Sequence, residues 1–233
     1  MPRRSKSVSV VAVVLAAGAG RRAGTRIPKQ FVRLPGGTLL DHALIRIGSH
    51  PRVGSVIVVV PRGRVRALEA LAIRHPKVVT VVAGGARRQD SVRRGVQAIV
   101  GRPADIVLIH DAARPLVPSH VIDAVIDAAL ACGAAVPGIE PADTVKEVGA
   151  GGCVERTIPR GRLRLIQTPQ AFRLDWLRLA LARVSPRKVF TDDASMVEAA
   201  GRTVRVVKGS PLSFKVTTLG DVARLRSLLG DGA

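Results

Sequence analysis

Apolar, β-branched runs alternate with amphipathic helical patterns along most of this chain of 233 residues. The runs are near-continuous, which is typical of parallel strands covered on both faces. They lie at 8–16, 55–60, 78–84, 105–111 and 134–140. Segments with apolar residues three and four positions apart, which favour helices, separate them at 39–50, 63–75, 89–100 and 118–133. This order predicts an α/β fold with a doubly wound, mostly parallel sheet and right-handed crossovers.

The last of these helical segments carries signals at both ends. Ser119 is a candidate N-cap, because its hydroxyl can accept a hydrogen bond from a free backbone N–H group. Gly133 stands where a helix commonly ends in a left-handed residue. We therefore expect the helix to follow Ser119 as its N-cap and to end before Gly133.

The alternation fails between about residues 141 and 172. Two short polar-apolar stretches within 143–158 flank the sequence GAGG, which is a hairpin signal. An isolated hairpin is marginally stable, so we expect this arm, residues 141–168, to pack against another surface, most economically a partner subunit. Helical patterns return at 174–184, 192–201 and 218–230, with a strand at 203–209 and the segment 213–217 after it. We expect one domain over 1–233 with a basic tail at 1–7.

The first run ends in a loop rich in glycine and arginine, VVLAAGAGRRAGTRIPKQF at residues 13–31. A Walker A loop is excluded because no Gly-Lys-Ser/Thr follows. A dinucleotide fingerprint nearly matches at 18–23, but Gly24 and Pro28 oppose the helix that this motif must open. A loop that holds a triphosphate through backbone N–H groups and cationic side chains fits better. The remaining alternative is a structural turn with exposed arginines.

Two further strand ends carry candidate binding residues, at the sheet edge where ligands of such folds bind. Asp111 directly follows an apolar run, where its carboxylate could hold Mg²⁺ together with phosphate oxygens. Arg114 could bind a substrate phosphate with two hydrogen bonds. The alternative is a turn that Asp111 caps, with Arg114 in solvent. His110 is expected to be a packing residue.

The segment after the third run, GGARRQDSV at 84–92, allows two interpretations. Gly84 and Gly85 could admit a base or a ribose, with Arg88 and Ser91 providing polar contacts. The alternative is an ordinary strand-to-helix turn, with Asp90 near the positive end of the helix dipole.

The formal net charge of +20 favours anionic partners. Nucleic acid is disfavoured, because the arginines are spread along the chain and because no Tyr, four Phe and one Trp offer few surfaces for stacking bases. The first apolar run is shorter than the roughly 20 residues of a membrane span, so no membrane partner is expected. Cys132 and Cys153 have no metal-ligand spacing, which indicates free thiols and a cytoplasmic location.

Several short motifs occur in a specific order between about residues 8 and 228. They are LAAGAGRRAG with PKQF, GGARRQDSV, HDAARP, DTVK, TPQAF, TDDAS and FKVT. This set closely resembles the 2-C-methyl-D-erythritol 4-phosphate cytidylyltransferase family of the non-mevalonate isoprenoid pathway. The resemblance implies a Rossmann-like nucleotidyltransferase fold and a homodimer joined through the protruding hairpin arm. It also implies that CTP and methylerythritol phosphate, with Mg²⁺ or another divalent cation, give the cytidine diphosphate alcohol and pyrophosphate.

The resemblance further implies roles for individual residues. Arg22 and Lys29 would stabilise charge at the α-phosphate, and Arg160 and Lys215 would position the attacking phosphate. The positions implied for the nucleotide are Ala16, Ala17, Gly18, Gly84, Gly85, Arg88 and Ser91. Those implied for the alcohol phosphate are Asp111, Arg114, Thr144, Thr168, Thr191 and Lys215. Asp111 is also the implied metal ligand, and Thr191 could instead serve only as a helix cap. Thr144 and Arg160 would serve the neighbouring subunit's site.

The resemblance leaves two other functions open. A related enzyme could use another polyol phosphate, such as ribitol 5-phosphate, because the same cations would bind it. A nucleic-acid-binding protein would use the positive charge and would bind independently of CTP. Ser213 and Phe214 depart from the family pattern just before Lys215, which leaves the geometry around that lysine open.

Overall fold

The computed structural model describes residues 8–18, 28–101, 104–183, 185 and 188–230. The basic tail 1–7 and the segment 19–27, which includes Arg22, lie outside these described residues.

The central sheet has the strand order β10-β7-β11-β6-β1-β4-β5, and β12 pairs with β7 as well. Its strands are β1 (Val10–Leu15), β4 (Val53–Val60), β5 (Val78–Ala83), β6 (Ile106–Asp111), β7 (Ala134–Ile139), β10 (Leu165–Ile166), β11 (Gln170–Arg173) and β12 (Arg205–Lys208). Strands β5, β4, β1 and β6 are parallel neighbours, and β12 is parallel to β7. The doubly wound, mostly parallel sheet is therefore confirmed.

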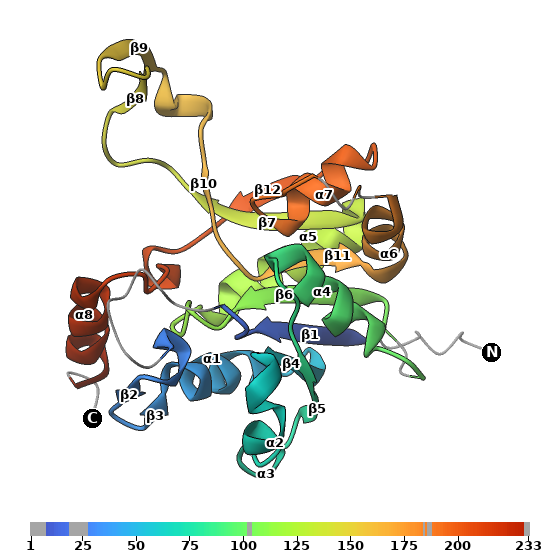
Figure 1. Ribbon diagram of the computed structural model, residues 1–233. Helices are drawn as coiled ribbons and strands as arrows, with labels where there is room; N and C mark the ends of the chain where they lie inside the picture. The colour runs from blue at the N-terminus through green and yellow to red at the C-terminus, as the bar shows by residue number, and fades with distance from the viewer. Residues whose placement is uncertain (1–7, 19–27, 102–103, 184, 186–187, 231–233) are drawn as a thin grey trace.

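Helices cover both faces of this sheet (Figure 1). They are α1 (Leu39–Gly48), α2 (Val65–Leu68), α3 (Leu71–Arg74), α4 (Arg88–Gln97), α5 (Ser119–Cys132), α6 (Leu174–Arg183), α7 (Asp193–Ala199) and α8 (Leu219–Gly230). Alternate residues of a strand point to opposite faces. Val10, Ala12 and Val14 accordingly share a buried cluster with α1 and α5, whereas Val11 and Val13 share one with α4, α6 and α7. Burial on both faces explains the near-continuous apolar runs.

Strand β11 was not predicted from the sequence. It runs antiparallel between β6 and β7, which would otherwise be neighbours. With four residues it is too short for a clear strand pattern, and its pairing partners on both sides define it. Ser213 is the last residue of the short 3₁₀ helix η5 (Pro211–Ser213), and the segment 213–217 contains no strand.

The helix predicted over 63–75 is divided into η3 (Arg62–Arg64), α2 and α3. Leu71 is the buried residue of α3, and α2 and η3 have none. Since tertiary packing supplies most of the stability of a helix, this small burial explains the break.

The two ends of α5 differ in how well they were predicted. Ser119 is its first helical residue and Pro118 occupies the N-cap, so the predicted cap was wrong by one position. Gly133 has a φ of 91°, which confirms the left-handed C-terminus.

The predicted hairpin is present. Strands β8 (Val145–Val148) and β9 (Val154–Ile158) pair antiparallel in a separate two-stranded sheet. In Figure 1 this hairpin lies away from the central sheet, at the end of two extended segments. Val148 and Val154 are 53% and 57% exposed on it. Another small hairpin joins β2 (Arg33–Leu34) to β3 (Gly37–Thr38).

No helix in the described part of the chain is long and apolar enough to cross a bilayer.

Candidate active site

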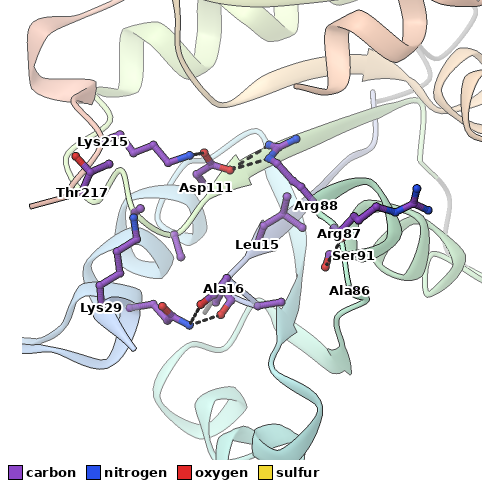
Figure 2. Close-up of a pocket in the computed structure, with 15 residues that line it drawn as sticks. Leu15, Ala16, Lys29, Ala86, Arg87, Arg88, Ser91, Asp111, Lys215 and Thr217 are labelled. Carbon is purple, nitrogen blue, oxygen red and sulfur yellow. Dashed lines mark hydrogen bonds and ion pairs between the residues drawn. The ribbon is translucent and has the colours of Figure 1, made fainter. Parts of the chain in front are cut away.

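A pocket of about 460 Å³ lies over the carboxyl ends of β1 and β6, shown in Figure 2. Leu15 and Asp111, the last residues of these two strands, are partners in the sheet register. The lining residues are Leu15, Ala16, Ala17, Gly18, Lys29, Gln30, Ala86, Arg87, Arg88, Ser91, Asp111, Ala112, Ala113, Lys215 and Thr217. The prediction that Asp111 lies at the carboxyl edge of the sheet is confirmed.

Two cations clamp the Asp111 carboxylate. Arg88 donates to Oδ1 from Nε at 3.3 Å and from Nη2 at 3.0 Å, and Lys215 donates to Oδ2 from Nζ at 2.7 Å. Burial would raise the pKa of Asp111, but Arg88 and Lys215 outweigh it and hold this pKa well below its usual range. Asp111 is therefore an anion on the pocket wall, with a cation on each of its carboxylate oxygens.

A chain of buried polar contacts fixes the backbone that carries Asp111. The Asp111 N–H donates to Thr168 Oγ1 at 3.0 Å, and Thr168 Oγ1 lies 3.1 Å from His110 Nδ1. His110 Nε2 lies 3.0 Å from the Arg114 carbonyl oxygen, which can only accept, so the ring proton is on Nε2. Burial lowers the pKa of His110 to about 4, which keeps the ring neutral. His110 is thus a structural residue, as predicted.

The segment after the opening loop is tied to the pocket by two side chains. Gln30 Nε2 donates to the carbonyl oxygens of Ala16 at 2.7 Å and Gly18 at 2.9 Å. Lys29 Nζ donates to the Val216 carbonyl oxygen at 2.8 Å. Both residues lie in the short 3₁₀ helix η2 (Lys29–Phe31), which follows Pro28. Lys29 is thereby held on the same side of the pocket as Thr217, next to the segment that carries Lys215 (Figure 2).

Gly84 and Gly85 do not line the pocket. A Cβ atom on Gly84 would lie 2.3 Å from the Ala17 Cβ, and one on Gly85 would lie 2.3 Å from the Asp90 Cβ. These glycines let the strand-to-helix turn approach its neighbours closely. The turn is further fixed by Ser91 Oγ, which accepts from the Gly85 N–H at 3.1 Å.

The predicted site residues divide into two groups. Those that the structure brings together on the pocket wall are Ala16, Ala17, Gly18, Lys29, Arg88, Ser91, Asp111 and Lys215. Arg114 and Thr168 do not line the pocket: Arg114 Nη1 donates to the Ser213 carbonyl oxygen at 2.6 Å, and Thr168 is buried against Asp111 and His110. Thr144 and Arg160 are exposed on the arm, and Thr191 is exposed just before Asp192, which caps α7. Arg22 lies outside the described residues.

Sequence reasoning missed several wall residues: Leu15, Gln30, Ala86, Arg87, Ala112, Ala113 and Thr217. All of them lie next to or inside motifs that were recognised. The backbone of a loop lines a pocket together with its side chains. Taking each recognised motif as a whole would therefore have predicted the pocket wall better than selecting single residues from it.

The comparisons with known proteins identify the family of this chain. The family model for 2-C-methyl-D-erythritol 4-phosphate cytidylyltransferase matches residues 10–231. The enzyme of that name from Rhodococcus jostii is 43% identical over 226 residues, which cover 96% of both chains. The bifunctional IspD/IspF enzyme of Rhodospirillum rubrum is 41% identical over 224 residues, and there the match covers 96% of this chain but 58% of the relative.

A crystal structure of 2-C-methyl-D-erythritol 4-phosphate cytidylyltransferase from Thermus thermophilus has a similar fold. It superimposes with a TM-score of 0.76 at 33% identity, over 95% of this chain and 98% of that one. The match in sequence and in fold therefore extends over nearly the whole chain, and this protein belongs to the 2-C-methyl-D-erythritol 4-phosphate cytidylyltransferase family.

Proposed function

We propose that the pocket over β1 and β6 is the site at which the chain carries out the reaction of its family. As a member of that family the chain is a cytidylyltransferase, which transfers the cytidylyl group of CTP to 2-C-methyl-D-erythritol 4-phosphate and releases pyrophosphate. One observation carries the assignment of the site. Lys29, Arg88 and Lys215 come from three separate segments and converge with Asp111 on one cavity.

The chemistry asks this site for charge neutralisation and positioning. An anionic oxygen of the alcohol phosphate attacks the α-phosphorus of CTP in line. A new P–O bond forms while the bond to the bridging oxygen of the β-phosphate breaks, and pyrophosphate leaves with that electron pair. The attacking oxygen already carries charge, so no general base is needed. Cations held in place beforehand lower the barrier because they meet charge where it develops.

Lys29 and Lys215 are the pocket cations that we assign to the phosphates. At an effective dielectric near 20, a cation about 4 Å from a unit negative charge contributes about 4 kcal/mol. Lys29 would stabilise the α-phosphate, together with Arg22. Lys215 is 42% exposed and already pairs with Asp111, so it can exchange that carboxylate for the incoming alcohol phosphate.

Enzymes that transfer nucleotidyl groups generally use divalent cations, and the residues here fit Mg²⁺ bound largely through substrate. No group of three or more His, Cys, Asp and Glu side chains that could hold a metal is present among the described residues. Mg²⁺ is commonly held by one or two carboxylates together with substrate phosphates and water. We therefore assign Asp111 as its protein ligand. When bound, Mg²⁺ would neutralise charge on the triphosphate.

We further propose that the protein is a homodimer in which the arm completes the neighbouring site. Thr144 and Arg160 belong to the arm, and Arg160 donates to the Ala142 carbonyl oxygen within it. Neither residue lines the pocket of its own chain. The exposed Val148 and Val154 give the hairpin an apolar surface that a partner subunit would cover. The enzyme is expected to work in the cytoplasm, since Cys132 and Cys153 are free thiols.

The reaction is tested by measuring pyrophosphate release from CTP and Mg²⁺ with and without the alcohol phosphate. ATP, GTP and UTP serve as nucleotide controls. Release that requires both CTP and 2-C-methyl-D-erythritol 4-phosphate is expected. Release with ribitol 5-phosphate instead would preserve the mechanism and change the substrate. If folded protein releases no pyrophosphate with either alcohol phosphate, the assignment is refuted.

The shared site is tested by mixing two inactive variants, Lys29→Ala and Arg160→Ala. In a mixed dimer one site has both mutations and the other has neither. Random exchange of subunits should therefore restore about one quarter of the wild-type activity. If the mixture stays inactive although subunits exchange, each chain completes its own site.

A further inference from the structure

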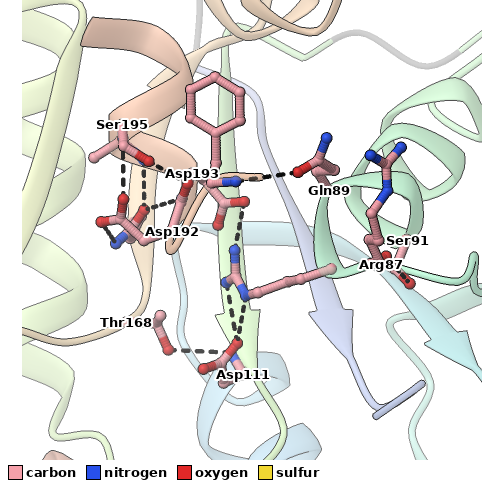
Figure 3. A network of polar contacts seen from close by, with 12 residues as sticks. Arg87, Gln89, Ser91, Asp111, Thr168, Asp192, Asp193 and Ser195 are labelled. Carbon is pink, nitrogen blue, oxygen red and sulfur yellow. Dashed lines mark hydrogen bonds and ion pairs between the residues drawn. The ribbon is translucent and has the colours of Figure 1, made fainter. Parts of the chain in front are cut away.

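The guanidinium of Arg88 is held between the carboxylates of Asp111 and Asp193, which come from different elements and are both labelled in Figure 3. On the pocket side it donates to Asp111, and on the opposite side Nη1 donates to Asp193 Oδ1 at 2.6 Å. Arg88 begins α4 and Asp193 begins α7. The ion pair with Asp193 therefore links two helices behind the pocket wall.

Asp193 is anchored and hidden from ligand. Its exposed fraction is 0%, and it does not line the pocket. Its backbone N–H donates to Gln170 Oε1 at 3.1 Å, as does that of Ala194 at 3.0 Å, so the start of α7 is fixed to β11. Oδ2 of Asp193 has no hydrogen-bond partner in the described part of the chain. Among the described residues, Arg88 is therefore the hydrogen-bond donor to the Asp193 carboxylate.

The electrostatics of Asp193 depend on this contact. Burial raises the pKa of Asp193 above its usual value, although Arg88 favours the charged form. Conversely, Asp193 and Asp111 outweigh the effect of burial on Arg88 and raise the pKa of its guanidinium. Each member of the pair stabilises the charge of the other in a place with little solvent.

The two cations on Asp111 differ in what lies behind them. The Lys215 side chain is 42% exposed, and its ion-pair partner in the described chain is Asp111. The Arg88 side chain is 26% exposed and has Asp193 behind it as a second counter-ion. A triphosphate entering the pocket attracts both cations. Without Asp193, Arg88 would be free to leave Asp111 and pair with a phosphate.

We propose that Asp193 is a positioning residue for cytidylyl transfer, which holds Arg88 on Asp111 when the anionic substrates enter. Asp193 touches no substrate. It makes Lys215 the cation that changes partners and Arg88 the one that stays, so that Asp111 keeps its orientation throughout the reaction.

The test is Asp193→Asn, which retains an acceptor for Arg88 and removes the charge. We expect kcat to fall by about 10–100-fold, as when a group that orients a functional residue is lost. The dissociation constant of CTP, measured calorimetrically with Mg²⁺ and no alcohol phosphate, should stay unchanged or decrease, because one negative charge behind the pocket wall has been removed. A loosened fold would instead weaken CTP binding together with kcat, and that result would overturn the proposal.

Asp192→Asn is the matched control, because it neutralises the adjacent carboxylate. Asp192 caps α7 and accepts from Gln170 Nε2 at 2.9 Å, but it has no contact with Arg88 in the described structure. Its kcat should stay within about threefold of wild type. An equal loss in both variants would show that the start of α7, and not the ion pair, is responsible.

A double-mutant cycle separates action through Arg88 from a general structural effect. In an Arg88→Ala background, Asp193→Asn should cause no further loss of kcat. A further loss as large as in the wild-type background would refute the proposal. If Asp193→Asn fails to fold, Arg88→Lys serves as the second variant, because one ammonium group cannot bridge both carboxylates in this geometry. It should lower kcat, and unchanged kcat would again refute the proposal.

Discussion

Gly84→Ala is expected to destabilise the fold, because the space for a side chain at this position is already filled. A Cβ there would lie 2.3 Å from the Ala17 Cβ, 2.9 Å from Ser91 Oγ and 3.4 Å from Val59 Cγ1. Carbon atoms in contact are normally about 3.5–4.0 Å apart. The Ala17 Cβ is attached directly to the backbone and cannot rotate away. The pocket wall itself must therefore shift by roughly 1 Å or more to restore a normal carbon–carbon distance.

The size of the effect follows from this crowding. Overpacking of a well-packed site costs about 1–3 kcal/mol. In a domain of this size each kcal/mol lowers the melting temperature by about 2–4 °C, so Gly84→Ala should melt about 2–12 °C below wild type. The KM for CTP should rise as well, since Ala17 and Ser91 both line the pocket. Thermal unfolding followed by circular dichroism, together with KM, measures both effects.

Gly48→Ala is the control, because a Cβ at this helical position meets nothing within 4 Å. It should be neutral or stabilise by about 0.5–1 kcal/mol. Gly84 could instead be needed only to admit a base, in which case Gly84→Ala would melt like wild type and lose CTP binding alone. That outcome would refute the packing argument. Full retention of both properties would show that the turn adapts without cost.

Three other changes test separate parts of the structure. Lys29→Ala should lower kcat by about 10²–10³, as for loss of one preorganised donor, and weaken CTP binding much less, whereas kcat within about threefold of wild type would make Lys29 a bystander. Gly133→Ala should lower the free energy of unfolding in urea by about 2 kcal/mol or more, because φ is 91° and the new Cβ would lie 2.4 Å from the Trp176 ring. Gly201→Ala is its control, since φ there is 79° but the space for a Cβ is open. It should lose only the part of the stability that comes from the strained backbone conformation. Thr217 and Thr218 donate hydrogen bonds to Asp221 that outweigh the effect of burial and lower the pKa of this carboxyl to about 2. Because this pKa is lower than in the unfolded chain, ionised Asp221 stabilises the fold above about pH 4, and this stabilisation is lost as the pH falls toward 2. The difference in unfolding free energy between wild type and Asp221→Asn should accordingly be on the order of 1–2 kcal/mol at pH 7 and should shrink over that range, and a difference independent of pH would contradict the assignment.

The parallel part of the sheet could be predicted because its signal is local. Strands β1, β4 and β6 are buried on both faces, so their apolar runs are visible without knowledge of their neighbours. The same reasoning located Asp111, since a carboxylate directly after such a run must lie at the edge of the sheet. The hairpin was visible for a different reason, because turn residues separate two short alternating stretches.

The rest depends on contacts between distant segments. Nothing in the four residues of β11 indicates that they separate β6 from β7. The role of Gly84 depends on where Ala17 lies. Asp193 was interpreted only as part of a helix, because its partner Arg88 lies more than a hundred positions away in the sequence. Local patterns indicate which residues are available for a site, whereas the arrangement of the strands determines which of them meet.

The way the arm joins the sheet has a consequence for how this protein can change in evolution. Ile139 of β7 and Leu165 of β10 are partners in the sheet register, so the chain leaves and re-enters the sheet at adjacent positions. The part between them is topologically an insertion in a tight connection, and its length and sequence can vary without altering the register of any core strand. In the proposed dimer, subunit recognition and core stability are thus encoded in separate stretches of one sequence. Each can diverge, be redesigned or be exchanged between relatives without cost to the other.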